Sequence, residues 1–146
     1  MKVAINGFGR IGRMVLRATA EHNIRDFQIV AINDLGSLKD NAHLFKYDSI
    51  HGRFPGKVNA TDTHLDVGLG PIQIIAEPNP EKLPWKDFGI DVVLECSGRF
   101  TKRADAAKHL EAGAKRVIVS APADNADITV VYGINHTNIN DSHLVI

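Results

Sequence analysis

The feature that most constrains this chain is a group of three glycines, Gly7, Gly9 and Gly12, which separates two patterned segments. Residues 2–5 before them are mostly apolar and partly β-branched, which is typical of a strand buried on both faces. After Gly9, apolar residues recur at the spacing of one helix face: Ile11, Met14, Val15 and Ala18. The sequence therefore predicts a strand that turns within a few residues into a helix.

The glycine spacing, G-x-G-x-x-G, indicates what this turn can bind. Gly7 permits a tight turn, Gly9 lets a pyrophosphate approach the bare backbone, and Gly12 lets the helix pack close to the strand. The free N–H groups at the start of the helix then face the phosphates. An ordinary turn between a strand and a helix is the alternative.

A second strand is predicted over residues 27–32, and Asp34 follows it about 20 positions after Gly12. At this separation a carboxylate accepts hydrogen bonds from the ribose hydroxyls of an adenosine. The same carboxylate would repel a 2′-phosphate, so the pattern favours NAD over NADP. A solvated turn residue or a helix cap is the alternative for Asp34.

The rest of the chain continues the alternation of strands and helices. Ser37 is expected to cap a helix, with Asp40 in the capping-box position. Residues 57–76 alternate with period two and predict a small antiparallel β excursion, after which prolines hold a loop open. Thr101 is expected to cap a later helix that ends near Gly113 and turns Ala104, Ala107 and Leu110 inward.

Four further strands are predicted, over residues 90–94, 116–120, 129–132 and 142–146. Strands that alternate with helices and are apolar on both faces indicate a parallel sheet between two helical layers. The predicted fold is therefore α/β, a Rossmann-type doubly wound, mostly parallel sheet with the antiparallel excursion.

Composition excludes several classes of function. The net charge of +0, with 44% hydrophobic and 23% charged residues, is that of a globular domain without a field for nucleic acid or an anionic membrane. No apolar run approaches the roughly 18 residues that a membrane span needs, and no secretion leader is indicated. The single cysteine, Cys96, excludes an internal disulfide and favours the reducing cytoplasm.

Several motifs resemble those of phosphorylating glyceraldehyde-3-phosphate dehydrogenases. AINGFGRIGR at residues 4–13 is similar to the N-terminal signature of that family. Matching stretches follow in order: AIND at 31–34, KYDS at 46–49, LECSG at 94–98, and GAK through SAP at 113–122. The resemblance covers the whole chain. It implies an NAD-dependent oxidoreductase of glycolysis, cytoplasmic and homotetrameric, that oxidises an aldehyde phosphate through a thioester.

The resemblance also carries the cofactor residues of the family onto matching positions. Backbone N–H groups of Arg10 and Ile11 would meet the pyrophosphate, Asn33 would lie beside the adenosine, and Asp34 would hold the ribose. The remaining implied positions run toward the nicotinamide: Ser97, Gly98, Phe100 and Ser120.

Two positions depart from the family pattern. Pro78 stands where the family often has an arginine, so a backbone carbonyl contact to adenine could survive but a side-chain contact could not. Ser97 replaces the commoner threonine, which keeps the hydroxyl group and loses a methyl group.

No catalytic or metal-binding residue is expected in this chain. The family's nucleophilic cysteine lies in a segment, SNASCTTN, that residues 1–146 do not contain. Cys96 is expected to be a packed, inert thiol, since a nucleophilic cysteine needs a neighbouring base or cation. The histidines lack metal-ligand spacing. Residues 1–146 are thus expected to form one NAD-binding domain without the catalytic domain, binding NAD without turnover. The aldehyde phosphate would bind only in the complete enzyme.

Two other functions fit the same residues. Erythrose-4-phosphate dehydrogenases share the N-terminal pattern, so this chain could be the cofactor domain of such an enzyme. A stand-alone, non-enzymatic nucleotide-binding module is the second alternative.

Overall fold

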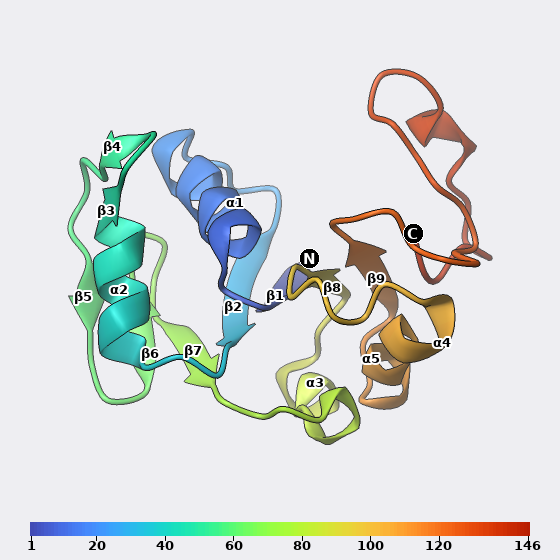
Figure 1. The fold of residues 1–146 in the computed structure, drawn as a ribbon, viewed down its shortest axis with the longest axis horizontal. Helices are drawn as coiled ribbons and strands as arrows, with labels where there is room; N and C mark the ends of the chain where they lie inside the picture. Colours follow the sequence, from blue (N-terminus) through green and yellow to red (C-terminus); the bar gives the residue numbers. More distant parts are fainter.

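The computed structural model describes residues 1–146, which form a seven-stranded sheet with helices on both faces (Figure 1). Five parallel strands make up most of the sheet, in the order β7-β2-β1-β8-β9. Their bounds are Lys2–Asn6 for β1, Gln28–Asn33 for β2, Ile72–Ile75 for β7, Val92–Glu95 for β8 and Arg116–Val119 for β9. The predicted doubly wound, mostly parallel sheet is confirmed.

The antiparallel excursion extends the sheet beyond β7. β5 (Asn59–Ala60) pairs antiparallel with β6 (His64–Asp66), which pairs antiparallel with β7. A separate antiparallel pair consists of β3 (Tyr47–Asp48) and β4 (Gly52–Arg53). The period-two pattern therefore predicted the excursion correctly, although its last strand, β7, joins the parallel sheet through β2.

Helices lie on both faces of the sheet. Figure 1 shows α1 (Arg10–Glu21) above the central strands, with α3 (Trp85–Phe88) and α5 (Lys108–Glu111) below them. The other helical segments are α2 (Leu38–Lys46), α4 (Arg103–Ala106) and two 3-10 turns, η1 (Pro80–Lys82) and η2 (His136–Asn138).

Alternation along β1 separates two cores. Val3 and Ile5 pack in one cluster with Leu16 of α1, whereas Ala4 packs in another with Trp85 of α3. Successive side chains of a strand point to opposite faces, so β1 is buried on both. Both faces of the sheet are thus covered, and the carboxyl ends of the strands stay available for a site.

Helix α2 begins after Ser37, the residue that the sequence predicts as its N-cap. The Ser37 side chain accepts a hydrogen bond from the backbone N of Asp40 at 3.1 Å, so the predicted N-cap is confirmed. Farther along the helix, Phe45 is fully buried and contacts Phe8 and Phe54, with ring centroids 6.2 and 4.8 Å apart. These rings anchor α2 beside the glycine turn.

The apolar face predicted for α1 is buried only in part: Met14 is half-buried and Val15 packs against the core, but the two ends of the predicted face are exposed. Ile11 is 49% exposed and Ala18 is also exposed, while Gly12, Leu16 and Thr19 are buried. The line of contact runs through Gly12 because a residue without a side chain allows the closest approach to β1. Proximity to the strand, rather than the distribution of apolar residues, decides which face turns inward.

The predicted helix cap at Thr101 is also wrong. The backbone O of Thr101 accepts from Asp124 N at 2.8 Å, and Arg103 N donates to Asp124 O at 2.9 Å, so the chain is extended here. The helical region begins only at Arg103 and consists of α4 followed by α5. Ala104 is exposed. Ala107 and Leu110, in contrast, pack against a small core cluster as predicted, beside the fully buried Ala106 and His109.

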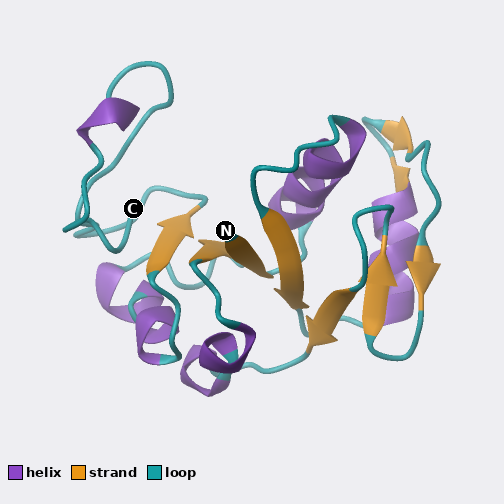
Figure 2. Cartoon of the chain, turned by 180° about the vertical axis from the view of Figure 1, so that it is seen from behind, coloured by secondary structure: helices purple, strands orange, loops and turns teal.

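The last two predicted strands differ from the structure. Residues 129–132 form no strand, and Val131 and Tyr132 are 55% and 89% exposed, because no neighbouring strand pairs with them. Figure 2 shows most of the chain after β9 as loop. The final segment pairs with β9 only around Val145, through a parallel bridge to Val117. No helix of this structure combines the length and apolar character needed to cross a membrane.

Asp127 holds the final segment, around Val145, in place through hydrogen bonds. Its carboxylate accepts from Arg103 Nε at 2.7 Å and from the backbone N of Leu144 and Val145 at 2.8 Å each. The Arg103 hydrogen bond and these backbone bonds lower the pKa of Asp127 from 3.8 to about 2. Because the native pKa is depressed, the stabilisation is present above pH 4 and is lost as the pH falls toward 2.

We predict that acid releases the final segment before the core unfolds. The Ile146 amide, which donates to Val117 O at 3.0 Å, reports this release. Its hydrogen-exchange protection factor should fall as the pH is lowered from 5 to about 2, and Asp127→Asn should lower it already at pH 7. Equal protection in wild type and Asp127→Asn at pH 7 would contradict the prediction.

Candidate functional site

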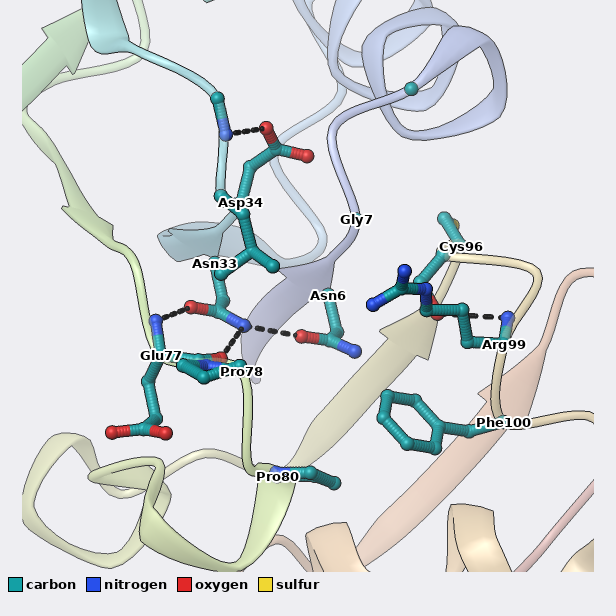
Figure 3. Close-up of a pocket in the computed structure, with 14 residues that line it drawn as sticks. Asn6, Gly7, Asn33, Asp34, Glu77, Pro78, Pro80, Cys96, Arg99 and Phe100 are labelled. Atoms are coloured by element: carbon teal, nitrogen blue, oxygen red, sulfur yellow. Dashed lines mark hydrogen bonds between the residues drawn. The ribbon is translucent and has the colours of Figure 1, made fainter.

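A pocket opens where β1, β2 and β8 end, at the point where the strand order reverses on either side of β1 (Figure 3). In open α/β sheets, ligands bind at such a switch point. The lining residues are Asn6, Gly7, Gly9, Asn33, Asp34, Leu35, Gly36, Glu77, Pro78, Pro80, Cys96, Ser97, Arg99 and Phe100. Most of them stand at the carboxyl end of a strand or within a few residues after it, so the topology of the sheet brings them together.

The structure explains differently why each of the three positions of the turn carries a glycine. Gly7 has a φ of +93°, and a Cβ there would lie 2.5 Å from the backbone of Ser97. A Cβ at Gly12 would lie 2.2 Å from the carbonyl O of Gly7. A Cβ at Gly9 would meet nothing within 4 Å, although Gly9 lines the pocket. The backbone thus requires Gly7 and Gly12, whereas Gly9 leaves open space in front of α1.

Asp34 is tied to this turn from the end of β2. Its Oδ2 accepts from the backbone N of Phe8 at 2.7 Å. Its Oδ1 accepts from Gly36 N at 2.9 Å and from Asn41 Nδ2 at 3.1 Å. A carboxylate has about four acceptor positions, so one stays free for a hydroxyl donor. The acid therefore faces the pocket beside the glycine turn and fits a ribose.

Asn33 lies on the same side of the pocket as Asp34. Its amide exchanges two hydrogen bonds of 2.9 Å with the backbone of Glu77, and its Nδ2 also donates to Asn6 Oδ1 at 2.7 Å. Figure 3 shows these bonds connecting Glu77, Asn33 and Asn6 along one wall of the pocket. The side chain of Asn33 is thus held by the protein and presents a fixed surface.

The remaining wall is partly aromatic. Figure 3 shows Phe100 on one side of the pocket, with Pro78 and Pro80 across from it. Phe100 is half-buried and its ring lies 6.1 Å from the His109 ring, edge to face. Flat apolar surfaces of this kind suit the faces of a planar base. The pocket therefore combines a surface for a base, an acid for a sugar and an open turn for phosphates.

Residues 1–103 match the family described as "Glyceraldehyde 3-phosphate dehydrogenase, NAD binding domain". The chain belongs to this family. Its cofactor is therefore NAD, and the open turn at Gly9 together with the carboxylate of Asp34 fits that dinucleotide.

Curated relatives support the same family. The chain is 60% identical over 146 residues to glyceraldehyde-3-phosphate dehydrogenase of Xanthobacter flavus, covering 100% of this chain and 44% of the relative. It is 53% identical to that of Thermotoga maritima, covering 99% and 44%. For that of Geobacillus stearothermophilus the identity is 55%, covering 92% and 40%. The chain thus spans less than half the length of these relatives.

The structure of this NAD-binding domain brings seven of the predicted site residues into one pocket: Gly7, Gly9, Asn33, Asp34, Pro78, Ser97 and Phe100. Gly98 lies outside the pocket in the same loop and is exposed. Ser120 lines a separate hollow after β9. The expected contacts at Gly98 and Ser120 stay predictions.

Arg10, Ile11 and Gly12 form the first turn of α1 and do not line the pocket themselves. Their expected role uses backbone N–H groups, which have no intrahelical partner in a first turn. The Arg10 side chain instead lies 3.4 Å from Asp48 of β3. The pKa of Asp48 is lowered to about 2, chiefly by the backbone N–H groups of His51 and Ile50 and also by Arg10.

Sequence reasoning missed seven lining residues: Asn6, Leu35, Gly36, Glu77, Pro80, Cys96 and Arg99. Asn6 and Cys96 could have been found, because each stands at the carboxyl end of a predicted strand. Cys96 is half-buried, and burial raises the pKa of its thiol, while a hydrogen bond with Ser120 opposes that rise. A raised thiol pKa disfavours the thiolate that a nucleophile needs.

We predict that two glycine substitutions affect different properties, one the stability of the fold and the other the binding of NAD. Gly12→Ala should lower the free energy of unfolding by about 2 kcal/mol, because its methyl group collides with the backbone of Gly7. Gly9→Ala should change it by less than about 1 kcal/mol, since the methyl group enters open space at the helix N-cap. Gly9→Ala should nevertheless weaken NAD binding, because the methyl group occupies the space before the helix. Chemical denaturation and calorimetric titration measure the two effects. Full-strength NAD binding by Gly9→Ala would contradict the prediction.

Arg99 provides a second prediction, because it is the only positively charged residue that lines the pocket, opposite the acids Asp34 and Glu77. Figure 3 shows its side chain reaching into the pocket, and it forms no ion pair. Arg99→Gln should weaken binding of NAD about tenfold, since a guanidinium attracts a pyrophosphate. Binding of adenosine, which has no phosphate, should be unchanged.

Calorimetry with both ligands measures this difference. Arg25→Gln, at an exposed arginine outside this pocket, is the matched control. Equal losses of NAD and adenosine binding in Arg99→Gln would show that Arg99 does not act on the phosphates.

Proposed function

We propose that this chain is the cofactor-binding part of an enzyme that oxidises glyceraldehyde 3-phosphate to an acyl phosphate. NAD, when bound, supplies the acceptor for the hydride. The observation that carries the proposal is the carboxylate of Asp34, bonded at 2.7 Å to the backbone of Phe8 beside the open turn at Gly9. This arrangement supports dinucleotide binding. The names of the relatives support the aldehyde phosphate over the alternative, erythrose 4-phosphate.

The chain's own residues would divide the binding between them. The N–H groups of Arg10 and Ile11 would hold the pyrophosphate at the positive end of α1. Asp34 would accept a hydrogen bond from the adenosine ribose at its free acceptor position and repel a 2′-phosphate, which favours NAD over NADP. Phe100 and Pro78, which face each other across the pocket, would hold the adenine base between apolar surfaces, so Phe100 would contact the adenine end of NAD rather than the nicotinamide end that the resemblance implies.

The chain by itself is proposed to bind NAD without turnover. Its only cysteine, Cys96, lies beside Ser120 and Glu95, neither of which generates a thiolate. The aldehyde phosphate, a homotetrameric assembly and a cytoplasmic location belong to the complete enzyme in this proposal. They rest on the family to which the chain belongs and on the names of its relatives.

A titration with NAD tests the proposal. The amide resonances of Phe8, Gly9 and Gly12 should shift in the ¹⁵N spectrum as NAD is added, and NADP should bind more weakly. Asp34→Asn should narrow the difference between the two dinucleotides, because it removes the charge that repels the 2′-phosphate. No NADH should form when glyceraldehyde 3-phosphate and phosphate are added to the NAD-loaded chain. Unchanged amide signals at saturating NAD would refute the cofactor assignment, and NADH production would refute the absence of turnover.

A further inference from the structure

Behind the pocket, a line of buried polar side chains connects elements that lie far apart in the sequence. Glu95 at the end of β8 is 1% exposed, and His109 of α5 and Trp85 of α3 are each 0% exposed. None of the three lines the pocket. Burying polar groups is costly unless each finds a partner, so their partners identify what they hold in place.

The carboxylate of Glu95 is the centre of this line. Its Oε2 lies 2.6 Å from Asn6 Nδ2 and 2.9 Å from His109 Nε2. Its Oε1 accepts from the backbone N of Ser97 at 2.7 Å and also from the Ser97 hydroxyl. Four contacts fill the acceptor positions of a carboxylate. Glu95 therefore joins the end of β1, helix α5 and the start of the loop that carries Phe100.

Trp85 decides which nitrogen of His109 carries the hydrogen. Trp85 Nε1 lies 3.0 Å from His109 Nδ1. An indole N–H can only donate, so Nδ1 is the acceptor and Nε2 donates to Glu95. All four partners of the Glu95 carboxylate are therefore donors.

From Glu95, the line of polar side chains continues through Asn6 to the pocket. Because Asn6 Nδ2 donates to Glu95, its Oδ1 faces Asn33 Nδ2 and accepts a hydrogen bond of 2.7 Å. Asn33 in turn exchanges hydrogen bonds with the backbone of Glu77. Asn6, Asn33 and Glu77 line one wall of the pocket, and Ser97, which also lines it, begins the loop whose Arg99 and Phe100 form the other wall. The carboxylate of Glu95 thus fixes the orientation of two amide groups and the position of both walls.

We propose that Glu95 and His109 are positioning residues for the dinucleotide, which they orient through Asn6, Asn33 and Ser97 without touching it. This inference rests on the proposed binding of NAD. A carboxylate is required at position 95, because a glutamine would place an NH₂ group against a partner that also donates. That conflict turns the Asn6 amide or releases Ser97, and the walls of the pocket lose their spacing.

The substitution Glu95→Gln in the intact chain tests the inference, with two controls. Val93→Ala, at a fully buried position of the same strand, creates a cavity and lowers stability without altering a hydrogen bond of the line. Glu111→Gln makes the same chemical change at an exposed position of α5. Trp85 is the only tryptophan of the chain, so its indole ¹⁵N–¹H signal reports the far end of the line unambiguously.

We expect NAD to shift the Trp85 indole signal of the wild type, although Trp85 lies outside the pocket. Glu95→Gln should abolish this response, shift the Ser97 amide and raise the dissociation constant of NAD at least about tenfold. Both controls should bind NAD within about twofold of the wild type. If the wild type binds NAD and folded Glu95→Gln binds it equally well, the positioning role is overturned while the cofactor assignment stands. A wild type that fails to bind NAD would overturn the proposed function itself.

Should Glu95→Gln fail to fold, Trp85→Phe tests the same line from its far end. Phenylalanine keeps an aromatic ring but removes the N–H group that sets the His109 tautomer. This variant should shift the Ser97 amide and raise the dissociation constant of NAD at least about threefold. An unchanged Ser97 amide together with unchanged binding would overturn the proposal.

Discussion

The pocket at the carboxyl ends of the strands depends on one constraint, the close approach of α1 to the end of β1. A Cβ atom at Gly12 would lie 2.2 Å from the carbonyl O of Gly7, so only glycine allows the helix to begin this near the strand. The approach directs the first turn of α1 at the mouth of the pocket, where its unpaired N–H groups face the open space at Gly9. It also explains why α1 turns Gly12 inward and leaves Ile11 exposed.

The placement of charges around the pocket depends on the same turn between β1 and α1. The carboxylate of Asp34 accepts a hydrogen bond from Phe8 N, so an acid is held against the positive end of the helix. Arg99 supplies the positive charge on the opposite wall. Behind both walls, the carboxylate of Glu95 accepts hydrogen bonds from four donors, which is what allows a charge to be buried at the carboxyl end of β8.

Local signals predicted those parts of the fold whose cause is local. The Ser37 cap, the first strand and the glycine turn were predicted correctly, because each depends on residues within one turn of helix or one short strand. Thr101 and residues 129–132 show where such signals fail. The backbone of Thr101 pairs with Asp124, and the β-branched run at 129–132 meets no partner strand. Neither the presence of the first pairing nor the absence of the second can be predicted from neighbouring residues.

The sequence by itself determined the family, the strand-to-helix turn and the acid that accompanies it, because glycine spacing and backbone conformation are local requirements. Tertiary structure alone decided that Asn6 meets Glu95 and that Glu95 meets His109 and Trp85. These hydrogen bonds join residues separated by up to 89 positions. Their formation depends on the order of β1 and β8 in the sheet and on which helix face is buried. Strand order arises from the packing of the whole chain, so no local pattern encodes it.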